Sequence, residues 1–392
     1  MAAALAASEN PNVQVVLLER QARVGRKLQA TGNGRCNLSN RQVGAEHYHG
    51  QDASFCVHAI STFDVDATLS WFSRLGLCTI TEDCGRIYPY SDQANSVVDV
   101  LRLGLERPNI SLRLGFEVIK IKNSPQGFAV CSEEETVLCD KLIVACGGIA
   151  GSKLGGTLSG YKLLGKLGHK CTKLRPNLVQ LQSNWQGLPS LKGVRANCRV
   201  EIRKNGNLHA HSTGELQFTE LGLSGPVIYE VSRDACTDSE NWEAVVDFLP
   251  QWEEAALSQE LKRRTLGNFS VEDLLTGILH NRLGRVLTRA AGIKGNLFCK
   301  ELNNGQLMDV CRCVKAFHIA LTQPLGMDSA QVTAGGILTD GFDPTTMESK
   351  LVPGLFACGE VLDIDGDCGG YNLQWAWSSG YIAGINAGKD SK

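Results

Sequence analysis

A glycine-rich loop, TGNGRCN at residues 31–37, combines several groups that can bind a flat or anionic ligand. Its two glycines permit left-handed backbone and a close approach of ligand to main chain, while the other residues add a guanidinium, a thiol and amides. The loop begins twelve residues after the end of VVLLE, which predicts a buried strand. The candidate binding residues are Gly32, Asn33, Gly34, Arg35, Cys36 and Asn37.

A second glycine-rich stretch, GLFACGEVLDIDGDCGGYNLQWAWSSG at residues 354–380, lies near the end of the sequence. We predict a strand over 355–358 that leads into Gly359 and Glu360, and a helix that begins directly after Gly369 and Gly370. Unpaired N–H groups and a partial positive charge at a helix N-terminus suit an electron-rich ligand edge. For either glycine pair alone, a tight turn that needs glycine only for its geometry is an equally good interpretation.

The carboxylate of Glu19 ends the first predicted strand, over residues 13–19, which follows a small-residue helix over 2–7. Helix and strand together resemble the second half of a βαβ unit, where such an acid binds the hydroxyls of an adenosine ribose. A solvated strand end is the alternative. The fingerprint glycines belong about 20 residues before that acid, so we expect this chain to lack the first strand and the phosphate-binding turn.

The remaining patterns predict the elements that must position these loops. Helical spacing indicates helices over 64–77, with Leu69, Phe72 and Leu75 on one face, and over 91–107. Alternating runs predict a small antiparallel sheet within 111–140, and KLIVACGG at 141–148 predicts a strand buried in the core. Short strands then dominate 169–248, and helical patterns dominate from 247 to about 323.

Composition excludes several classes of protein. With 392 residues, 43% hydrophobic and 20% charged, the chain is long enough for two or three domains. A net charge of -2 provides no global basic field for nucleic acid, and no apolar run approaches the roughly 18 residues of a membrane span. Fifteen scattered cysteines favour reduced thiols in the cytoplasm. We expect no metal site, because His209 and His211 lack partners and Cys311 and Cys313 fall in a predicted helix.

Five longer motifs carry a resemblance: VVLLERQARVGRKLQATGNGRCNLSN, GRIYPYSDQA, GELQFTELGLSGP, VTAGGI and TMESKLVPGLFACGEVLDIDGDCGGYNLQWAWSSGYIAG. Together they resemble the BaiN/YhiN-type family of FAD-dependent oxidoreductases, sometimes labelled aminoacetone oxidase-like. The resemblance implies an α/β fold of the two-dinucleotide-binding-domain flavoprotein type. Its Rossmann-like FAD domain would comprise 1–168 and 329–392, with an inserted domain over 169–328 made of a β-barrel (169–248) and a helical part (249–328).

The resemblance also implies roles for individual residues. Glu19 would bind the adenosine ribose, and Val118 would meet the adenine through its backbone. The 31–37 loop would lie along the pyrophosphate and isoalloxazine, Gly359 and Glu360 along the pyrophosphate and ribitol, and Gly335 and Gly336 at the ring edge. The flavin pyrimidine would be bound by Gly370, Tyr371, Asn372 and Leu373. The absent glycine fingerprint predicts weak FAD retention, and Glu220 stands where many relatives have histidine.

Three activities are compatible with this family. The leading prediction is NAD(P)H-dependent reduction of an activated C=C bond in a small, sterol-like or enone substrate, with NADH or NADPH docking transiently. CGGIAGSKLGG at 146–156 favours a crossover into the insert over a second nucleotide site. The alternatives are oxidation of a small amine such as aminoacetone, and reduction of uridine in RNA, for which basic runs at 162–173 and 262–264 offer a foothold. A cofactor-free relative that only binds partners is a fourth class. The substrate, the catalytic residue and the oligomeric state stay unassigned.

Overall fold

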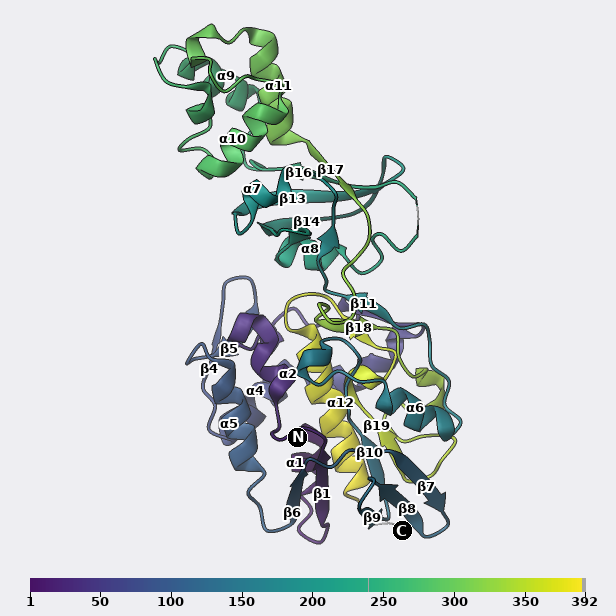
Figure 1. Cartoon of the computed structure of the whole chain (residues 1–392). Coiled ribbons are helices and arrows are strands. Elements are labelled where there is room, and N and C mark those ends of the chain that lie inside the picture. The colour runs from purple at the N-terminus through teal and green to yellow at the C-terminus, as the bar shows by residue number, and fades with distance from the viewer. Residues whose placement is uncertain (239, 390–392) are drawn as a thin grey trace. The chain divides into compact units, whose positions relative to one another are not determined.

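The computed structural model describes residues 1–238 and 240–389 and divides the chain into two compact units. One unit combines Met1–Pro176 with Ala330–Lys392, and the other is the intervening Asn177–Ser329. The first unit is therefore built from both ends of the chain, as Figure 1 shows by the purple and yellow segments that lie together in it. No helix in the described part of the chain is long and apolar enough to cross a membrane.

Two pairs of parallel strands form the centre of the first unit. Strand β1 (Val15–Glu19) pairs with β6 (Ile110–Leu114), and β10 (Leu142–Val144) pairs with β19 (Leu355–Ala357). The expectation that β1 is a buried strand is wrong, because its side chains are mostly half-buried and Val16 is 39% exposed. Within the described residues β1 has a strand partner on one edge only.

Helices α1 (Ala2–Ala7) and α12 (Tyr371–Ala387) pack together beside these strands. Every residue of α1 is buried, and a Cβ added at Gly384 would overlap the carbonyl oxygen of Ala3. Small residues on both helices therefore allow their backbones to approach closely, and this contact fixes the axis of the long helix α12.

The other elements of the first unit surround this centre (Figure 1). The predicted helices at 64–77 and 91–107 are confirmed as α4 and α5, and Trp71 and Phe72 of α4 are buried. The predicted antiparallel sheet is formed by β7, β8 and β9. The bounds are α2 Arg26–Ala30, α3 Val57–Thr62, α4 Val65–Arg74, α5 Ala94–Gly104, α6 Ser159–Lys166, β2 Ser39–Asn40, β3 Tyr48–His49, β4 Thr79–Thr81, β5 Arg86–Pro89, β7 Lys120–Ser124, β8 Gly127–Cys131, β9 Thr136–Cys139, β11 Arg175–Asn177, β18 Val332–Ala334 and β20 Asp365–Gly366.

A six-stranded antiparallel sheet forms most of the second unit, in the order β12-β15-β14-β13-β16-β17. Leu181 of the first strand bridges to Pro324, just beyond the last strand, so the sheet almost closes into a barrel. The strands are β12 Leu181–Gln182, β13 Arg195–Lys204, β14 Asn207–Phe218, β15 Gly222–Ser224, β16 Trp242–Asp247 and β17 Phe317–Leu321, and the helices are α7 Leu188–Leu191, α8 Pro226–Val231, α9 Glu254–Arg264, α10 Asn281–Ala290 and α11 Asn304–Lys315.

Strand β17 corrects the expectation that the chain is helical from 247 to about 323. Phe317, Ile319 and Leu321 are buried while the residues between them are exposed, which is the two-residue period of a strand. The run is only five residues long and follows α11 almost directly. The strand pairs antiparallel with β16 and completes the barrel-like sheet.

Candidate functional site

The 31–37 loop is a series of left-handed backbone conformations. Gly32, Asn33, Gly34 and Cys36 all have positive φ, between 56° and 86°. A Cβ added at Gly32 would lie 2.8 Å from the backbone nitrogen of Asn37, whereas one added at Gly34 would meet no atom within 4 Å. Gly32 is thus explained by the turn itself, while Gly34 borders open space that a ligand can fill.

The two most reactive side chains of the loop are already engaged. Arg35 donates hydrogen bonds to the carboxylates of Glu82 and Asp92, and its guanidinium lies 4.0 Å from the ring centroid of Tyr88. The bond to Glu82, followed by the bond to Asp92, raises the pKa of the guanidinium. Cys36 is fully buried, and desolvation raises the pKa of its thiol to about 12, against a smaller opposite effect of Thr31. We therefore expect the Cys36 thiol to stay protonated and unreactive near neutral pH.

Asn37 and Gly370 meet where α12 begins. The side-chain oxygen of Asn37 is buried and has no hydrogen-bond partner. A Cβ at Gly370, whose φ is 104°, would lie 2.9 Å from that oxygen and 2.5 Å from the carbonyl oxygen of Ser39. Gly370 is the N-cap of α12 and provides no side-chain cap, which confirms the predicted glycine pair before a helix. An orphaned acceptor beside uncapped helix amides fits a ligand edge that carries both donors and acceptors, as a flavin pyrimidine does.

The first side chains of α12 hydrogen-bond or pack against other parts of the same chain. Asn372 donates to the carbonyl oxygen of Gly366 (2.7 Å) and accepts from the nitrogen of the same residue (2.8 Å). Tyr371 stacks its ring on that of His47 at 4.1 Å between centroids, and Leu373 packs against the buried cluster around α4 and α5. Because these side chains bind their own chain, a ligand at this point would meet the backbone of α12 and not its first side chains.

Glu360 connects several segments at the ends of β10 and β19. Its carboxylate accepts hydrogen bonds from Lys27 (2.7 Å) and from the backbone nitrogen of Thr333 (2.8 Å). Gly359 and Gly147, which follow the two strands, have φ of 73° and open space where a Cβ would point. Ligands of open parallel sheets bind at such carboxyl ends. Lys27 and Gly147 were missed from the sequence, although Lys27 lies only four residues before the glycine loop.

Close packing of neighbouring backbone is enough to explain why residues 335 and 336 are glycines, without any ligand. A Cβ at Gly335 would lie 2.5 Å from the carbonyl oxygen of Lys173, and one at Gly336 would lie 2.5 Å from the carbonyl carbon of Leu362. The backbone nitrogen of Gly336 already donates its hydrogen bond to the hydroxyl of Thr172, at 2.8 Å. Their role at the ring edge stays a prediction.

Glu19 and Val118 lie in one corner of the first unit. The carboxylate of Glu19 accepts from the nitrogen of Gln21 (2.7 Å), and its carbonyl oxygen accepts from the nitrogen of Phe116 (3.0 Å). Val118 follows two residues later, in the irregular segment before β7. The structure therefore brings together the two residues predicted for the adenosine end.

A third group near α12 was not found from the sequence. His47 and His49 hydrogen-bond the two oxygens of Asp367 at 3.0 and 2.6 Å. More than 300 residues separate the partners, and neither HYH nor DGDC is a recognised motif. Only the pairing of β3 with β20 juxtaposes them.

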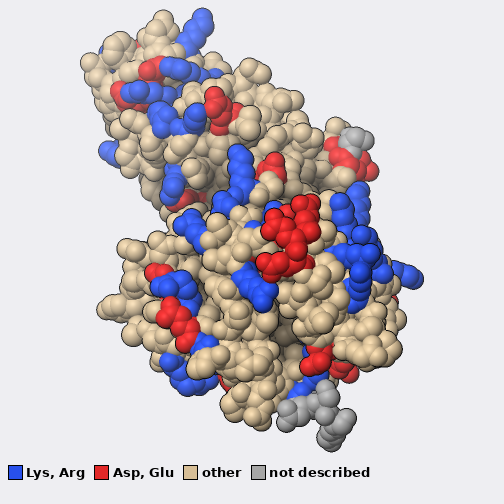
Figure 2. Space-filling model, turned by 60° about the horizontal axis from the view of Figure 1, so that its bottom comes forward, with Lys and Arg blue, Asp and Glu red and all other residues tan. Residues whose placement is uncertain are grey.

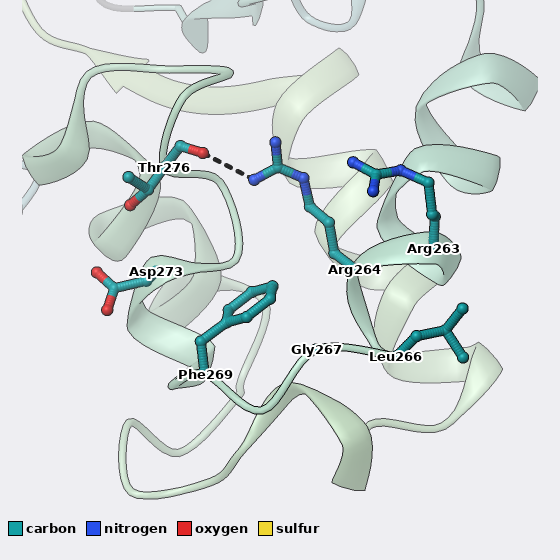
Figure 3. Close-up of a pocket in the computed structure, with 7 residues that line it drawn as sticks. All are labelled: Arg263, Arg264, Leu266, Gly267, Phe269, Asp273 and Thr276. Carbon is teal, nitrogen blue, oxygen red and sulfur yellow. Dashed lines mark hydrogen bonds between the residues drawn. The ribbon is translucent and has the colours of Figure 1, made fainter.

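Other candidates lie elsewhere. Glu220 is exposed in the second unit and pairs with Lys192 at 2.7 Å. Among the described residues no cluster of His, Cys, Asp and Glu could hold a metal ion. A pocket of about 600 Å³ opens beside α9 in the second unit (Figure 3), and no predicted site residue lines it. Its arginines serve the fold: Arg264 donates to the carbonyl oxygen of Thr276 at 2.7 Å, and Glu260 binds both Arg263 and Arg264.

Comparison with known proteins identifies the class. Residues 1–386 match the family described as HI0933-like protein Rossmann domain, so the chain belongs to this family of FAD-dependent oxidoreductases. A 3-dehydro-bile acid delta(4,6)-reductase of Clostridium scindens is 36% identical over 98% of this chain and 95% of its own length. The ribosomal RNA dihydrouridine synthase of Escherichia coli is 30% identical over 94% of this chain and 90% of its own. A 3-ketosteroid-delta4-(5alpha)-dehydrogenase of Rhodococcus jostii RHA1 is 13% identical, with 99% and 94% coverage and a TM-score of 0.47.

The residues present fit the flavin of this family. Gly34, Gly147 and Gly359 border open space, and the orphaned oxygen of Asn37 lies beside the uncapped amides of α12. Bound there, FAD would supply two-electron hydride chemistry, and the chain would supply position and electrostatics.

Proposed function

We propose that this protein is an FAD-dependent reductase of an activated carbon–carbon double bond in a small organic molecule, with NADH or NADPH as a transient electron donor. The observation that carries the proposal is the 36% identity, over almost the whole chain, to a relative named as a bile acid delta(4,6)-reductase. In a reaction of that kind, one carbon of the conjugated double bond accepts a hydride and the other accepts a proton, so the site requires a donor for each.

The chain's own contribution would be to hold and polarise the cofactor. The amides at the start of the 17-residue helix α12 would face the pyrimidine end, where the partial positive charge of the helix favours negative charge. The buried thiol of Cys36 excludes water without taking part in redox chemistry. Cytoplasmic residence belongs to the proposal and fits fifteen cysteines that form no disulfide bond in the structure.

Transient docking of the nicotinamide is supported by the 146–156 segment. Arg20 donates to the carbonyl oxygen of Gly155 (2.9 Å), and Arg26 to that of Lys153 (3.0 Å). The segment is thereby tied to the chain that follows Glu19, inside the same compact unit. This arrangement favours a connection within the FAD unit over a separate nucleotide-binding domain.

RNA is the second candidate substrate, because a relative named as a ribosomal RNA dihydrouridine synthase is 30% identical. The sequence from 141 to 200 contains no aspartate or glutamate, and exposed lysines on and after α6 include Lys162, Lys166, Lys170 and Lys173. In the view of Figure 2, however, Lys and Arg mix with Asp and Glu over the face. Because charges of both signs share that face and the net charge of the chain is -2, we favour the small substrate.

Anaerobic spectroscopy on the FAD-loaded protein tests the proposal. We expect NADH or NADPH to bleach the flavin, and a conjugated 3-oxo-4-ene steroid to restore its absorption without oxygen. Reoxidation by a uridine-containing RNA, with none by the enone, would replace the lead with the RNA activity. Bleaching by a small primary amine and recovery only in air would indicate an oxidase.

A further inference from the structure

His47, Asp367 and His49 form a cluster that the proposed function does not yet use. Both carboxylate oxygens of Asp367 are engaged, one by Nδ1 of His47 at 3.0 Å and one by Nε2 of His49 at 2.6 Å. Burial opposes ionisation of Asp367, but the hydrogen bonds from His49 and His47 outweigh it and lower the pKa of the carboxyl. An ionised carboxylate only accepts hydrogen bonds, so both imidazole nitrogens that face it must donate.

Three kinds of contact hold residues 365–367: strand pairing, a backbone hydrogen bond and the two imidazoles. Strand β20 pairs with β3 so that Asp365 faces His49 and Gly366 faces Tyr48. The backbone nitrogen of Asp367 donates to the carbonyl oxygen of His47 at 3.0 Å. Backbone and side-chain hydrogen bonds to residues 47–49 therefore fix the chain that enters the turn at 367–370.

The fixed segment leads directly into the uncapped start of α12. Gly369 and Gly370 follow Asp367 with φ of 138° and 104°, conformations that few residues adopt and that glycine does not hold unaided. On the far side, the ring of Tyr371 is clamped by stacking on His47, and its carbonyl oxygen accepts from the hydroxyl of Tyr48 at 3.0 Å. His47 thus touches both ends of the glycine turn.

We propose that Asp367, with His47 and His49, is a positioning group that fixes the 367–370 turn and so aims the first amides of α12 at the flavin pyrimidine. The inference rests on the proposed FAD site. In this proposal the cluster pre-organises the cofactor site. The conformational entropy of the two consecutive glycines is lost when the protein folds, so cofactor binding does not have to order them. None of the three side chains needs to touch the reacting substrate.

The test compares Asp367→Asn with Glu46→Gln, a matched control that removes one carboxylate charge from an exposed side chain next to His47. FAD affinity of the apoprotein is measured by flavin fluorescence, together with the flavin absorption band and the melting temperature of the apoprotein. We expect Asp367→Asn to raise the dissociation constant at least tenfold and to shift the bound flavin's absorption, with a melting temperature close to that of Glu46→Gln. His47→Gln, which retains a donor, should lose less affinity than His47→Ala.

Each other outcome contradicts the inference. If Asp367→Asn binds FAD as the unaltered chain does, the cluster does not position the turn. If it lowers the melting temperature of the apoprotein substantially and affinity returns at low temperature, the cluster only supports the fold. If the unaltered chain binds no FAD at all, the proposed function fails first and this inference with it.

Discussion

Two glycine turns of the first unit look alike in the sequence and differ in the structure. At Gly335 and Gly336 the space of a missing Cβ is filled by the backbone of Lys173 and Leu362. At Gly359 that space is empty, and the adjoining Glu360 is held by Lys27. Both pairs were predicted to bind the cofactor. The comparison teaches that glycine can be required either for close packing of neighbouring backbone or for close approach of a ligand. Only the atoms around the glycine distinguish these two reasons.

The largest effect is expected for Gly335→Ala. The new Cβ would lie 2.5 Å from a backbone oxygen at a φ of 90°, so both a clash and left-handed strain arise. We expect a loss of about 2–4 kcal/mol in the free energy of unfolding. Urea unfolding of the apoprotein measures it. A loss below about 0.5 kcal/mol would show that this turn is not tightly packed and would erase the contrast.

Glu19→Ala should act on the ligand and leave the fold intact. Removing the acceptor for the adenosine ribose should weaken FAD binding by about 1–3 kcal/mol, the usual cost of leaving buried hydroxyl donors unpaired. The flavin absorption spectrum should stay unchanged, because Glu19 belongs to the opposite end of the cofactor. Equilibrium titration of the apoprotein with FAD checks this. An unaltered dissociation constant would make Glu19 a plain strand end.

Gly359→Ala is the counterpart of the first substitution. With no atom within 4 Å of the new methyl group, only the strain of a φ of 73° remains, about 1–2 kcal/mol of stability. The methyl group would instead occupy the open space, so FAD affinity should fall more than stability does. The same two measurements as for Gly335→Ala decide it. An affinity that is unchanged would mean that no ligand approaches this turn.

The smallest effect is expected at Cys36. This residue belongs to the 31–37 loop, which borders open space at Gly34, but its own side chain is fully buried, as the space around Gly335 is filled. Cys36→Ser should keep measurable turnover, because the thiol has no redox partner. Burial raises its pKa to about 12, from an ordinary value of 9.0, so Cys36 should resist iodoacetamide at pH 9 while exposed Cys78 reacts. Since the folded pKa lies above the unfolded one, this thiol's contribution to stability is complete below pH 9 and declines between pH 9 and about 12. Mass spectrometry of the alkylated protein and urea unfolding against pH test both statements.

The sequence predicted those parts of the fold that follow local periodicity. Helices α4 and α5, the sheet of β7 to β9 and the glycine N-cap of α12 are confirmed, because apolar spacing and Gly370 decide them locally. Strand β17 was misassigned, since five alternating residues next to a helix gain their strand conformation from pairing with β16. Likewise the Lys27–Glu360 bridge and the Asp367 cluster depend on contacts across more than 300 residues, which no local pattern encodes.

The pairing of β16 with β17 has a consequence for how this protein can be rebuilt. The two strands are antiparallel neighbours, with Val246 opposite Phe317, so the helices between them occupy the position of a single hairpin loop. Such a loop adds only a slowly growing closure entropy, however long it becomes. Changes in the length of the connections between these helices should therefore cost little, whereas loss of the helices themselves would expose the sheet, because Leu257, Leu283 and Val310 share one buried cluster with Val246 and Phe317.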